Sequence, residues 1–562
     1  MMNKLCNVKT PFVVLMLGIS CAGLFASASQ ETEGTTVTPP GIFGKYEPVI
    51  TLETVKFASQ SNIESINTKL NPVTGETIEE TRWHTVFRDE LGINITYKWI
   101  ADAEHGGEKL RLMLASGDLP DMIPLGGNDQ GKIQFTQLAD GGLIQDLTEV
   151  WEKYAAPLTR EVVEADGDVV YTAAMREGKL LAIPAPKAGL DTNSYFWIRQ
   201  DWLDKLGLDP PRTPEELLEV TRAFAKDDPD GNGVDDTYAM MMNKQLWYRS
   251  EGFFWTFDSY PDMWQKDGKG DLMYGAIQPE TKDALSALAM MHADGRLDPE
   301  WAVKDSAKAD EMFAENRIGI SYGGHWISYN FISGYENDPS IDWNCYPPPG
   351  KNGEIPRAEI ELGLNQIWVV RKGYEHPAAL VKSFNMYWEM LYGETGDYEY
   401  WGNDELMDGI WWIGPYASFH PWVNITPYYD IQEVYAGTKK PEDLRGVSLD
   451  YYNNTENNPK PIEGWAWQKM FSDPDKSPFG HITKMIEGEM IDLDNFTGAP
   501  TETMIDRWAT LQELQLNTFT RIIVGDLDVD SGFEEFVTNW KNLGGDKITE
   551  EVSAWYRNAV GN

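Results

Sequence analysis

The sequence has few cysteines for its length. Its 562 residues include only Cys6, Cys21 and Cys345, and the first two lie close to the N-terminus. Only Cys345 remains for the body of the chain, so an intramolecular disulfide framework is excluded there. A chain of this length buries a core large enough to be stable without such cross-links.

Basic residues are also scarce. The 47 lysines and arginines face 89 aspartates and glutamates, which gives a formal net charge of −42. A nucleic-acid backbone or an anionic membrane surface attracts a basic face, so this balance argues against both as partners. It also disfavours a highly anionic ligand, although a local basic pocket remains compatible with it. Tryptophan, in contrast, is abundant, with 22 residues.

The motifs of common catalytic sites are missing as well. No GxSxG, HExxH or P-loop pattern stands in a fitting context, and the seven histidines are scattered along the chain. These patterns therefore give no positive indication of an enzyme. The alternative to a binding protein is a carbohydrate-active enzyme, a glycoside hydrolase or lyase, because 89 acidic residues leave room for a catalytic pair of carboxylates.

The N-terminus has the features of an export signal. Residues 1–28 combine a positively charged start with an apolar run too short to span a bilayer. Cleavage at the Ala-Ser-Ala site of 26–28 would release a soluble protein, whereas Cys21 could become a lipid-modified N-terminus. Residues 29–46 have the composition of a flexible tether. Either way, we expect an extracytoplasmic protein without a later transmembrane helix.

Strand-like and helical segments alternate in the body of the chain. The patterns predict strands at 49–58, 93–100, 121–125, 195–198, 317–322 and 367–370, and helices at 80–91, 108–116, 213–226, 282–297 and 377–391. This alternation is typical of an α/β fold with parallel sheets, in which the loops after the strands line a ligand crevice. The stretch 397–467 is aromatic and weakly periodic, so we interpret it as a long, irregular, functional region.

Oxygen-bearing side chains alternate in the acidic loop that follows the predicted helix at 213–226. Alternation of this kind lets several oxygens converge on one hard cation, which predicts a structural Ca²⁺ site. The ligands would be loop positions one, three, five, seven (through its carbonyl) and nine: Asp228, Asp230, Asn232, Val234 and Asp236. Position twelve of the full EF-hand pattern is Ala239 instead of glutamate. The alternative is a solvated acidic turn without a metal.

Six segments make the sequence resemble the extracellular solute-binding proteins of family 1. They are LASGDLPDMI at 114–123, IRQDWLDKLGL at 198–208, DPDGNGVDD at 228–236, YGAIQPETKDAL at 274–285, GRLDPEW at 295–301 and FEEFVTNWKNLGGDKITEEVSAWY at 533–556. More narrowly, the sequence is similar to the large lipoproteins that supply oligosaccharides to ABC importers, a subgroup related to alginate-binding proteins. The segments are spread over nearly the whole mature chain.

This resemblance implies an α/β, periplasmic-binding-protein-like fold of type II, with two lobes, a hinge and a ligand cleft between the lobes. By analogy, residues 47–188 with 319–360 would form the N-terminal lobe, and 189–318 with 361–562 the C-terminal lobe. It also implies an oligosaccharide ligand, ABC permease subunits as partners and calcium in the acidic loop. We expect a monomer in the periplasm or at the cell surface, attached to a membrane only through lipid on Cys21.

A sugar needs flat aromatic platforms for its C–H faces and polar side chains for its hydroxyl groups. Tryptophans in Gly- and Pro-rich loops, or just after a predicted strand, are therefore candidate platforms. The predicted ligand contacts are His325, Trp326, Trp255, Trp411, Trp412, Trp465 and Trp467. For each tryptophan the alternative is packing in the core. His325 is expected to form hydrogen bonds and not to bind a metal, because no second histidine lies at metal-ligand spacing.

Overall fold

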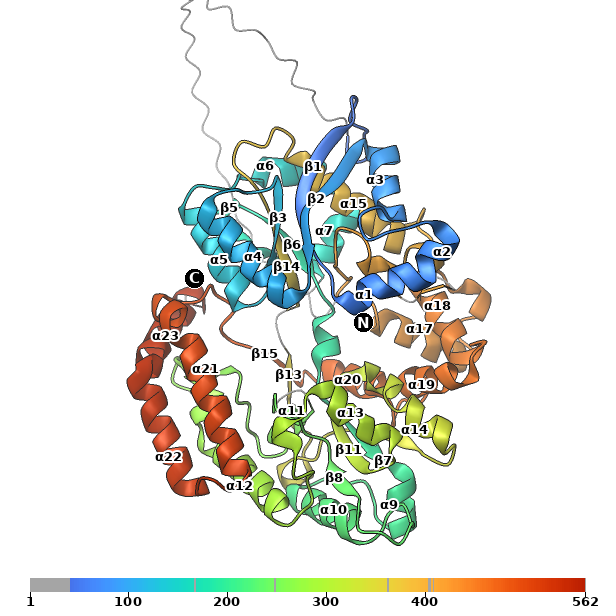
Figure 1. Cartoon of the computed structure of the whole chain (residues 1–562), viewed down its shortest axis with the longest axis vertical. Coiled ribbons are helices and arrows are strands. Elements are labelled where there is room, and N and C mark those ends of the chain that lie inside the picture. Colours follow the sequence, from blue (N-terminus) through green and yellow to red (C-terminus); the bar gives the residue numbers. More distant parts are fainter. Residues whose placement is uncertain are drawn as a thin grey trace, which may run out of the picture.

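The computed structural model describes residues 41–165, 168–246, 249–360, 363–402, 406–407 and 409–560. These residues form two lobes, which lie one above the other in Figure 1. The predicted signal at 1–28, its Cys21 and most of the predicted tether lie outside the described residues. Within the described part of the chain, no helix is both long enough and apolar enough to cross a membrane.

The upper lobe contains two small sheets and a hairpin. In the sheets, β1 (Ile50–Phe57) pairs in parallel with β2 (Ile93–Ala101), and β14 (Leu364–Val370) lies antiparallel between β3 (Met122–Gly126) and β6 (Ile183–Pro186). The hairpin joins β4 (Met175–Arg176) and β5 (Lys179–Leu180). The helices are α1 (Gln60–Ser65), α2 (Asn71–Thr74), α3 (Arg82–Leu91), α4 (Ala103–Ser116), α5 (Asp129–Asp140), α6 (Thr148–Tyr154), α7 (Pro157–Glu164), α8 (Asp168–Thr172), α15 (Ala378–Tyr392) and α16 (Tyr398–Trp401).

The lower lobe contains a four-stranded sheet of order β12-β7-β11-β8. Its strands are β7 (Tyr195–Arg199), β8 (Tyr238–Met240), β11 (Ile318–Gly323) and β12 (Trp343–Tyr346), and a separate hairpin joins β9 (Trp264–Lys266) to β10 (Leu272–Tyr274). The helices are α9 (Gln200–Leu206), α10 (Pro214–Lys226), α11 (Glu251–Trp255), α12 (Pro279–Ala293), α13 (Ser306–Ala314), α14 (Ile332–Asn337), α21 (Glu502–Ile523), α22 (Val529–Trp540) and α23 (Asp546–Val560). Among these described strands only β8 and β11 pair in parallel, so this sheet is mixed and the prediction of parallel sheets is wrong for it, although β1 and β2 of the upper lobe do pair in parallel.

Strand β7 separates two apolar cores. Tyr195 and Trp197 belong to the core that continues into the upper lobe, whereas Phe196 and Ile198 belong to the core that α10, α12 and α21–α23 cover. Consecutive side chains of a strand point to opposite faces, so a strand buried on both faces must be apolar throughout. This requirement explains the uninterrupted apolar run at the start of β7.

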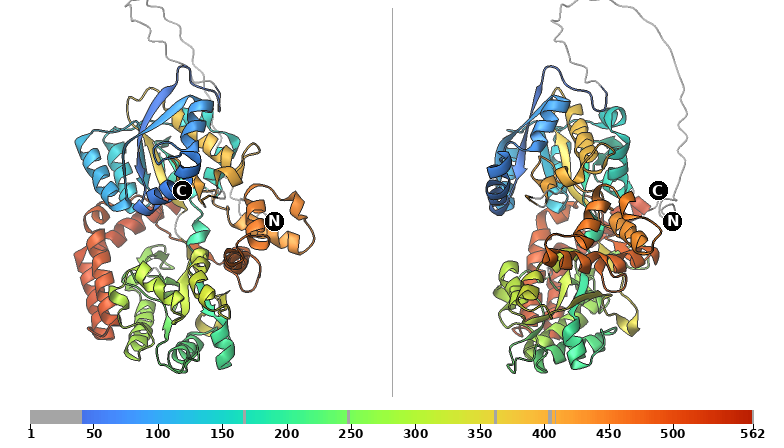
Figure 2. Two further views of the ribbon diagram at one scale, coloured as in Figure 1. Left: turned by 45° about the vertical axis from the view of Figure 1, so that its right-hand side comes forward. Right: turned by 90° about the vertical axis from the view of Figure 1, so that its right-hand side faces the viewer.

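Helices α17 (Ile425–Tyr435), α18 (Gly446–Glu456), α19 (Pro461–Phe471) and α20 (Pro478–Glu487) lie beside both lobes (Figure 1). α18 packs on α15 and α16 of the upper lobe, and α19 packs on α14 of the lower lobe. Figure 2 shows α17 and α18, in orange, on the side of the molecule opposite α21–α23, in red. The prediction of a long irregular region at 397–467 is therefore wrong, because much of it is helical.

Segments that run between the lobes lie side by side. One joins β6 to β7, another joins β12 to β14 through β13 (Ala358–Ile360), and a third leaves α20 through β15 (Ile491–Leu493). β13 pairs in parallel with β15, and the backbone N–H of Lys187 donates to the carbonyl of Gly363 at 3.0 Å. Movement of one lobe against the other would bend all of these segments together.

The lobe boundaries predicted by analogy are wrong for two returning segments. The analogy places residues 319–360 in the N-terminal lobe, but β11 and β12 extend the sheet of the lower lobe. It places residues from 361 onward in the C-terminal lobe, but β14 pairs with β3 and β6 in the upper lobe. Buried apolar strands look alike in sequence, so their local pattern does not reveal which sheet they join.

Candidate functional site

A pocket of about 450 Å³ opens in the upper lobe, where β1 ends and β14 begins. α1, which carries one of its lining residues, lies on the side of the upper lobe that faces the lower lobe (Figure 1). Aromatic and amide side chains dominate the wall. The lining residues are Val55, Lys56, Phe57, Asn62, Pro124, Asn365, Gln366, Trp368, Trp411, Trp412, Pro415, Ala417 and Phe419.

Hydrogen bonds hold the wall segment 411–419 against the sheet. The Nδ2 of Asn365 donates to the carbonyl of Ala417 at 2.6 Å, and the hydroxyl of Tyr387 donates to the carbonyl of Trp411 at 3.2 Å. At its far end, the N–H of Phe419 donates to the carbonyl of Pro186 at 3.0 Å, where β6 leads into the segment toward the lower lobe. The pocket wall is thus fixed both to the sheet and to the connection between the lobes.

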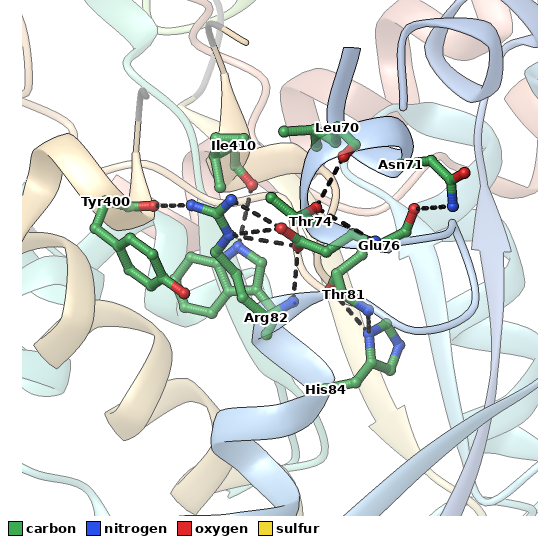
Figure 3. Close-up of polar contacts among 10 residues, drawn as sticks. Leu70, Asn71, Thr74, Glu76, Thr81, Arg82, His84, Tyr400 and Ile410 are labelled. Atoms are coloured by element: carbon green, nitrogen blue, oxygen red, sulfur yellow. Dashed lines mark hydrogen bonds and ion pairs between the residues drawn. The ribbon is translucent and has the colours of Figure 1, made fainter. Parts of the chain in front are cut away.

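A second set of contacts fixes the chain just before this wall, as Figure 3 shows. Arg82 lies between the carboxylate of Glu76, at 2.8 Å, and the carbonyl of Tyr400, to which it donates at 2.7 Å. Its guanidinium also lies over the Tyr400 ring, 4.3 Å from the centroid. The indole N–H of Trp83 donates to the carbonyl of Ile410 at 3.0 Å. The start of α3 therefore positions the segment that leads into Trp411 and Trp412.

Among the described residues that line the pocket, Lys56 is the one with a charged side chain. Its side chain comes from β1, is 5% exposed, and donates to the carbonyls of Trp412, at 2.8 Å, and of Gly414. Burial lowers the pKa of Lys56 to about 7. The neighbouring His84 on α3 is neutral, because burial first, and then the charge of Lys56, lower its pKa to about 3.

Of the predicted ligand contacts, Trp411 and Trp412 line this pocket. They belong to a single turn of 3₁₀ helix, η7 (Ile410–Trp412), and both rings are partly buried. The Trp411 ring packs against Phe419, with 4.1 Å between centroids and 63° between planes. The structure places these two residues where a ligand could touch them, and their contact with a ligand stays a prediction.

His325 and Trp326 lie in the lower lobe, directly after β11, in η5 (His325–Tyr329). Trp326 and Tyr329 are each 40% exposed, which is high for aromatic side chains. The His325 ring packs against Trp326 and against Phe479, with centroids 5.2 and 4.8 Å apart. Burial lowers the pKa of His325 to about 3, so this side chain is neutral at physiological pH.

The remaining three predicted tryptophans differ in exposure. Trp465 and Trp467 are partly buried on α19, where Trp465 stacks on Tyr335 at 4.3 Å and Trp467 meets Tyr329 edge-on at 6.3 Å. Trp467 thus adjoins η5, and Trp465 packs against α14 instead. Trp255 is 1% exposed and packs against Tyr260 within the core. The structure corrects the prediction for Trp255, because a ring this deeply buried offers no surface to a ligand.

Sequence reasoning missed several residues of the pocket wall. Lys56, Phe57 and Asn62 follow one another closely at the end of the first predicted strand, and Gln366 and Phe419 come from distant parts of the chain. The rule that loops after strand ends line the crevice pointed to the region of Asn62. No local signal marked Gln366, because only the return of β14 to the upper lobe places it in the pocket.

The predicted calcium ligands are close together in the loop after α10. Asn232 connects two of them, because its Nδ2 donates to Asp230 at 2.7 Å and to Asp236 at 3.2 Å. The carboxylate of Asp228 accepts from the backbone N–H of Gly233 at 3.1 Å. Burial, followed by the neighbouring carboxyl groups of Asp228 and Asp236, raises the pKa of Asp230. These oxygens fit a cation chemically, since a positive charge would relieve the repulsion.

The described side chains alone do not make up a complete set of metal ligands. Among the described residues, no three Asp, Glu, His or Cys side chains are grouped so that they could hold a metal ion. The predicted ligand set also uses the Asn232 side chain and the Val234 carbonyl, which supply neutral oxygens. The calcium site therefore stays a prediction at Asp228, Asp230, Asn232, Val234 and Asp236.

Comparison with known proteins connects this architecture to a family. Residues 76–386 match the family described as bacterial extracellular solute-binding protein. Lipoprotein LipO of Bacillus subtilis (strain 168) is 23% identical over 506 residues, which cover 83% of this chain and 87% of LipO. The polygalacturonan/rhamnogalacturonan-binding protein YtcQ of the same strain is 22% identical over 484 residues, covering 82% of this chain and 85% of YtcQ.

A solved structure shows the same fold. It is the S. pneumoniae ABC-transporter substrate-binding protein FusA, as an EF-hand mutant in complex with fructo-nystose. The two folds align with a TM-score of 0.62 and 17% identity, over 91% of this chain and 100% of that one. At this identity the similarity establishes the fold, and with it the predicted two-lobed, periplasmic-binding-protein-like architecture.

Proposed function

Because this chain belongs to the family of bacterial extracellular solute-binding proteins, we propose that it captures an oligosaccharide and delivers it to an ABC permease. The relatives support a saccharide ligand, since YtcQ is a polygalacturonan/rhamnogalacturonan-binding protein and FusA was solved with fructo-nystose. The family consists of binding proteins, so the alternative of a glycoside hydrolase or lyase has no support here. The protein works outside the cytoplasm, as the family does.

The observation that carries the proposal is the aromatic pocket of the upper lobe. Trp411, Trp412 and Phe57 offer flat apolar faces, and Asn62 and Gln366 offer amide groups beside them. Sugars present both C–H faces and hydroxyl groups, and a wall of rings and amides complements them. The exposed rings of Trp326 and Tyr329 on the lower lobe would form the opposing face when the lobes close.

Closure would follow from the way the lobes are connected. The wall segment 411–419 is hydrogen-bonded to Pro186, at the start of one segment that runs between the lobes. A ligand that contacts both lobes binds the closed arrangement more tightly and shifts the population toward it. The permease would then recognise the closed protein. We also propose that the protein is a monomer and that a lipid on Cys21 anchors it to the membrane.

Calorimetric titration with a panel of neutral and acidic oligosaccharides tests the function. We expect at least one to bind, and we expect Trp412→Ala to weaken binding roughly tenfold, since loss of an aromatic contact costs about 0.5–1.5 kcal/mol beyond its buried area. Tyr429→Ala, which removes a ring 39% exposed on α17, serves as the control and should bind like the wild type. The proposal is wrong if no saccharide binds, and the pocket is misassigned if Trp412→Ala binds normally.

The acidic loop supplies a second part of the proposal, a structural Ca²⁺ held by Asp228, Asp230, Asn232, Val234 and Asp236. The interacting carboxyl groups of Asp228 and Asp230 support it, as does the description of the FusA structure as an EF-hand mutant. The ion would offset two of the negative charges of the loop and fix the end of α10 to β8. It would not contact the oligosaccharide, because the loop belongs to the lower lobe and contributes no residue to the described pocket wall.

A further inference from the structure

The pocket of the upper lobe contains a buried cation without an acidic partner among the described residues. Lys56 is 5% exposed, and the contacts of its Nζ are the carbonyls of Trp412 and Gly414. An ammonium group has three N–H donors, so one is left over after these two hydrogen bonds. A buried charge is costly unless an opposite charge accompanies it.

The rest of the described pocket wall also lacks negative charge. The chain has 89 acidic residues, yet no aspartate or glutamate is among the described residues that line the pocket. Amide donors are present instead. The Oε1 of Gln366 accepts from the indole N–H of Trp368 at 3.0 Å, which occupies that oxygen and leaves the Nε2 group to donate. Asn62 adds a second amide just after the end of β1.

We propose that Lys56 recognises an anionic substituent, a carboxylate or a sulfate ester, on the captured saccharide, so that the protein selects acidic over neutral oligosaccharides. This inference rests on the proposed function of the same pocket. The anion would accept from the third N–H of Lys56 and supply the missing opposite charge. The amide of Gln366 would donate to it as well, and the rings of Trp411 and Trp412 would pack on the sugar face beside it.

A purely structural role for Lys56 is the competing explanation. Its two hydrogen bonds fasten the segment that carries Trp412 to β1, and a neutral amine could make them too. The two explanations differ in what they predict for charge. If Lys56 only holds the segment that carries Trp412, its replacement changes the affinity for all ligands equally. If Lys56 binds an anion, its replacement changes the affinity differently for ligands that differ only in charge.

The test uses matched oligosaccharides, measured by calorimetry on the full-length mature protein. Oligogalacturonates are compared with their methyl esters, and sulfated galactan oligosaccharides with their desulfated forms. The two pairs separate a carboxylate ligand from a sulfated one. For at least one pair we expect the anionic member to bind about 10- to 100-fold more tightly, as expected of a buried hydrogen bond to a charged group.

Two variants and a control assign the preference to Lys56. Lys56→Gln should remove most of the preference for the anionic member, because it should weaken binding of that member more than binding of the neutral one. Asn62→Asp places a negative charge in the wall at a residue that does not contact Lys56 Nζ, and it should weaken the anionic member more than the neutral one. Lys69→Gln removes an exposed lysine of the same lobe and should leave both affinities unchanged. Melting temperatures of all variants identify any that fail to fold.

The pH dependence gives an independent measurement on the wild type. In the ligand-free protein, burial lowers the pKa of Lys56 to about 7. Above that pH, affinity for the anionic member should fall about tenfold per pH unit. The neighbouring His84 stays neutral over this range, and no other titratable side chain is among the described lining residues. Binding of the neutral member should not vary.

The outcomes separate this inference from the proposed function. If neutral saccharides bind as tightly as anionic ones and Lys56→Gln affects both equally, Lys56 is a structural fastener and the inference fails while the function stands. The inference also fails, and the function again stands, if the anionic preference survives in Lys56→Gln and in Asn62→Asp. If no saccharide of either kind binds, the proposed function fails together with the inference.

Discussion

The contacts between Glu76, Arg82 and Tyr400 provide a sharp test of how the pocket wall is held (Figure 3). The Glu76 carboxylate accepts from the backbone N–H of Arg82 at 2.8 Å and from its guanidinium at 2.8 and 3.1 Å. The Arg82 and Glu76 side chains are 6% and 11% exposed. Glu76→Gln keeps the shape of the side chain and removes the negative charge that it presents to the buried guanidinium of Arg82.

The expected cost follows from this burial. Breaking a buried ion pair by removing one partner costs about 3–5 kcal/mol, because the other charge remains buried. Arg82 keeps its contacts with the carbonyl and the ring of Tyr400, and the new amide oxygen still accepts a hydrogen bond. We therefore expect Glu76→Gln to lower the free energy of unfolding by about 2–3 kcal/mol.

Urea unfolding followed by tryptophan fluorescence measures this loss. The control is Glu80→Gln, which breaks the pair of Glu80 with Arg88 at 2.7 Å; these side chains are 52% and 36% exposed. An exposed pair contributes less than about 1 kcal/mol, so the control should change little. Glu76→Gln should also weaken oligosaccharide binding, because Arg82 and Trp83 position the segment before Trp411. Equal stability losses in the two variants would refute the reasoning from burial.

Two further predictions concern metal and pH. Removing calcium with a chelator should lower the free energy of unfolding by about 2.7 kcal/mol, if calcium was present at about a hundredfold excess over its dissociation constant. Asp230→Ala should show no effect of the chelator. If the chelator does not change the stability of the wild type, the proposed metal site is wrong. Burial lowers the pKa of Lys56 to about 7 from 10.5, so the unfolded chain binds more protons between these pH values and stability should rise with pH across that window. Lys56→Met should show a smaller rise in urea unfolding measured from about pH 7 to 10, because Lys382, whose pKa burial lowers to about 8, still contributes; an unchanged slope would contradict a buried Lys56.

Each helix and strand that the sequence predicted is present in the structure, with ends that differ by a few residues. Thr213 and Pro214 mark the start of α10, where the Thr213 hydroxyl accepts from the N–H of Glu216 at 3.2 Å. Gly117 marks the end of α4, where its φ of 72° suits glycine. Capping and termination are local chemistry, so a few neighbouring residues determine them.

Helices α17–α19 escaped prediction because their apolar residues do not follow one stripe. α19 buries Ala466 and Met470 but also carries Trp465 and Trp467 on neighbouring faces, since it packs against both α20 and α14. A helix covered on several sides loses the clear period of an amphipathic helix. The aromatic, Asn- and Pro-rich composition then resembles that of a loop.

By itself, the sequence determined the class of the fold, the spacing of the acidic loop and a family resemblance. These properties depend on residue type and on order along the chain. Only the tertiary structure decided which lobe each returning strand joins, that Trp255 is buried, and that Lys56 meets Trp412 and Gln366 in one pocket. Those facts depend on contacts between residues far apart in the chain, for which no local pattern carries information.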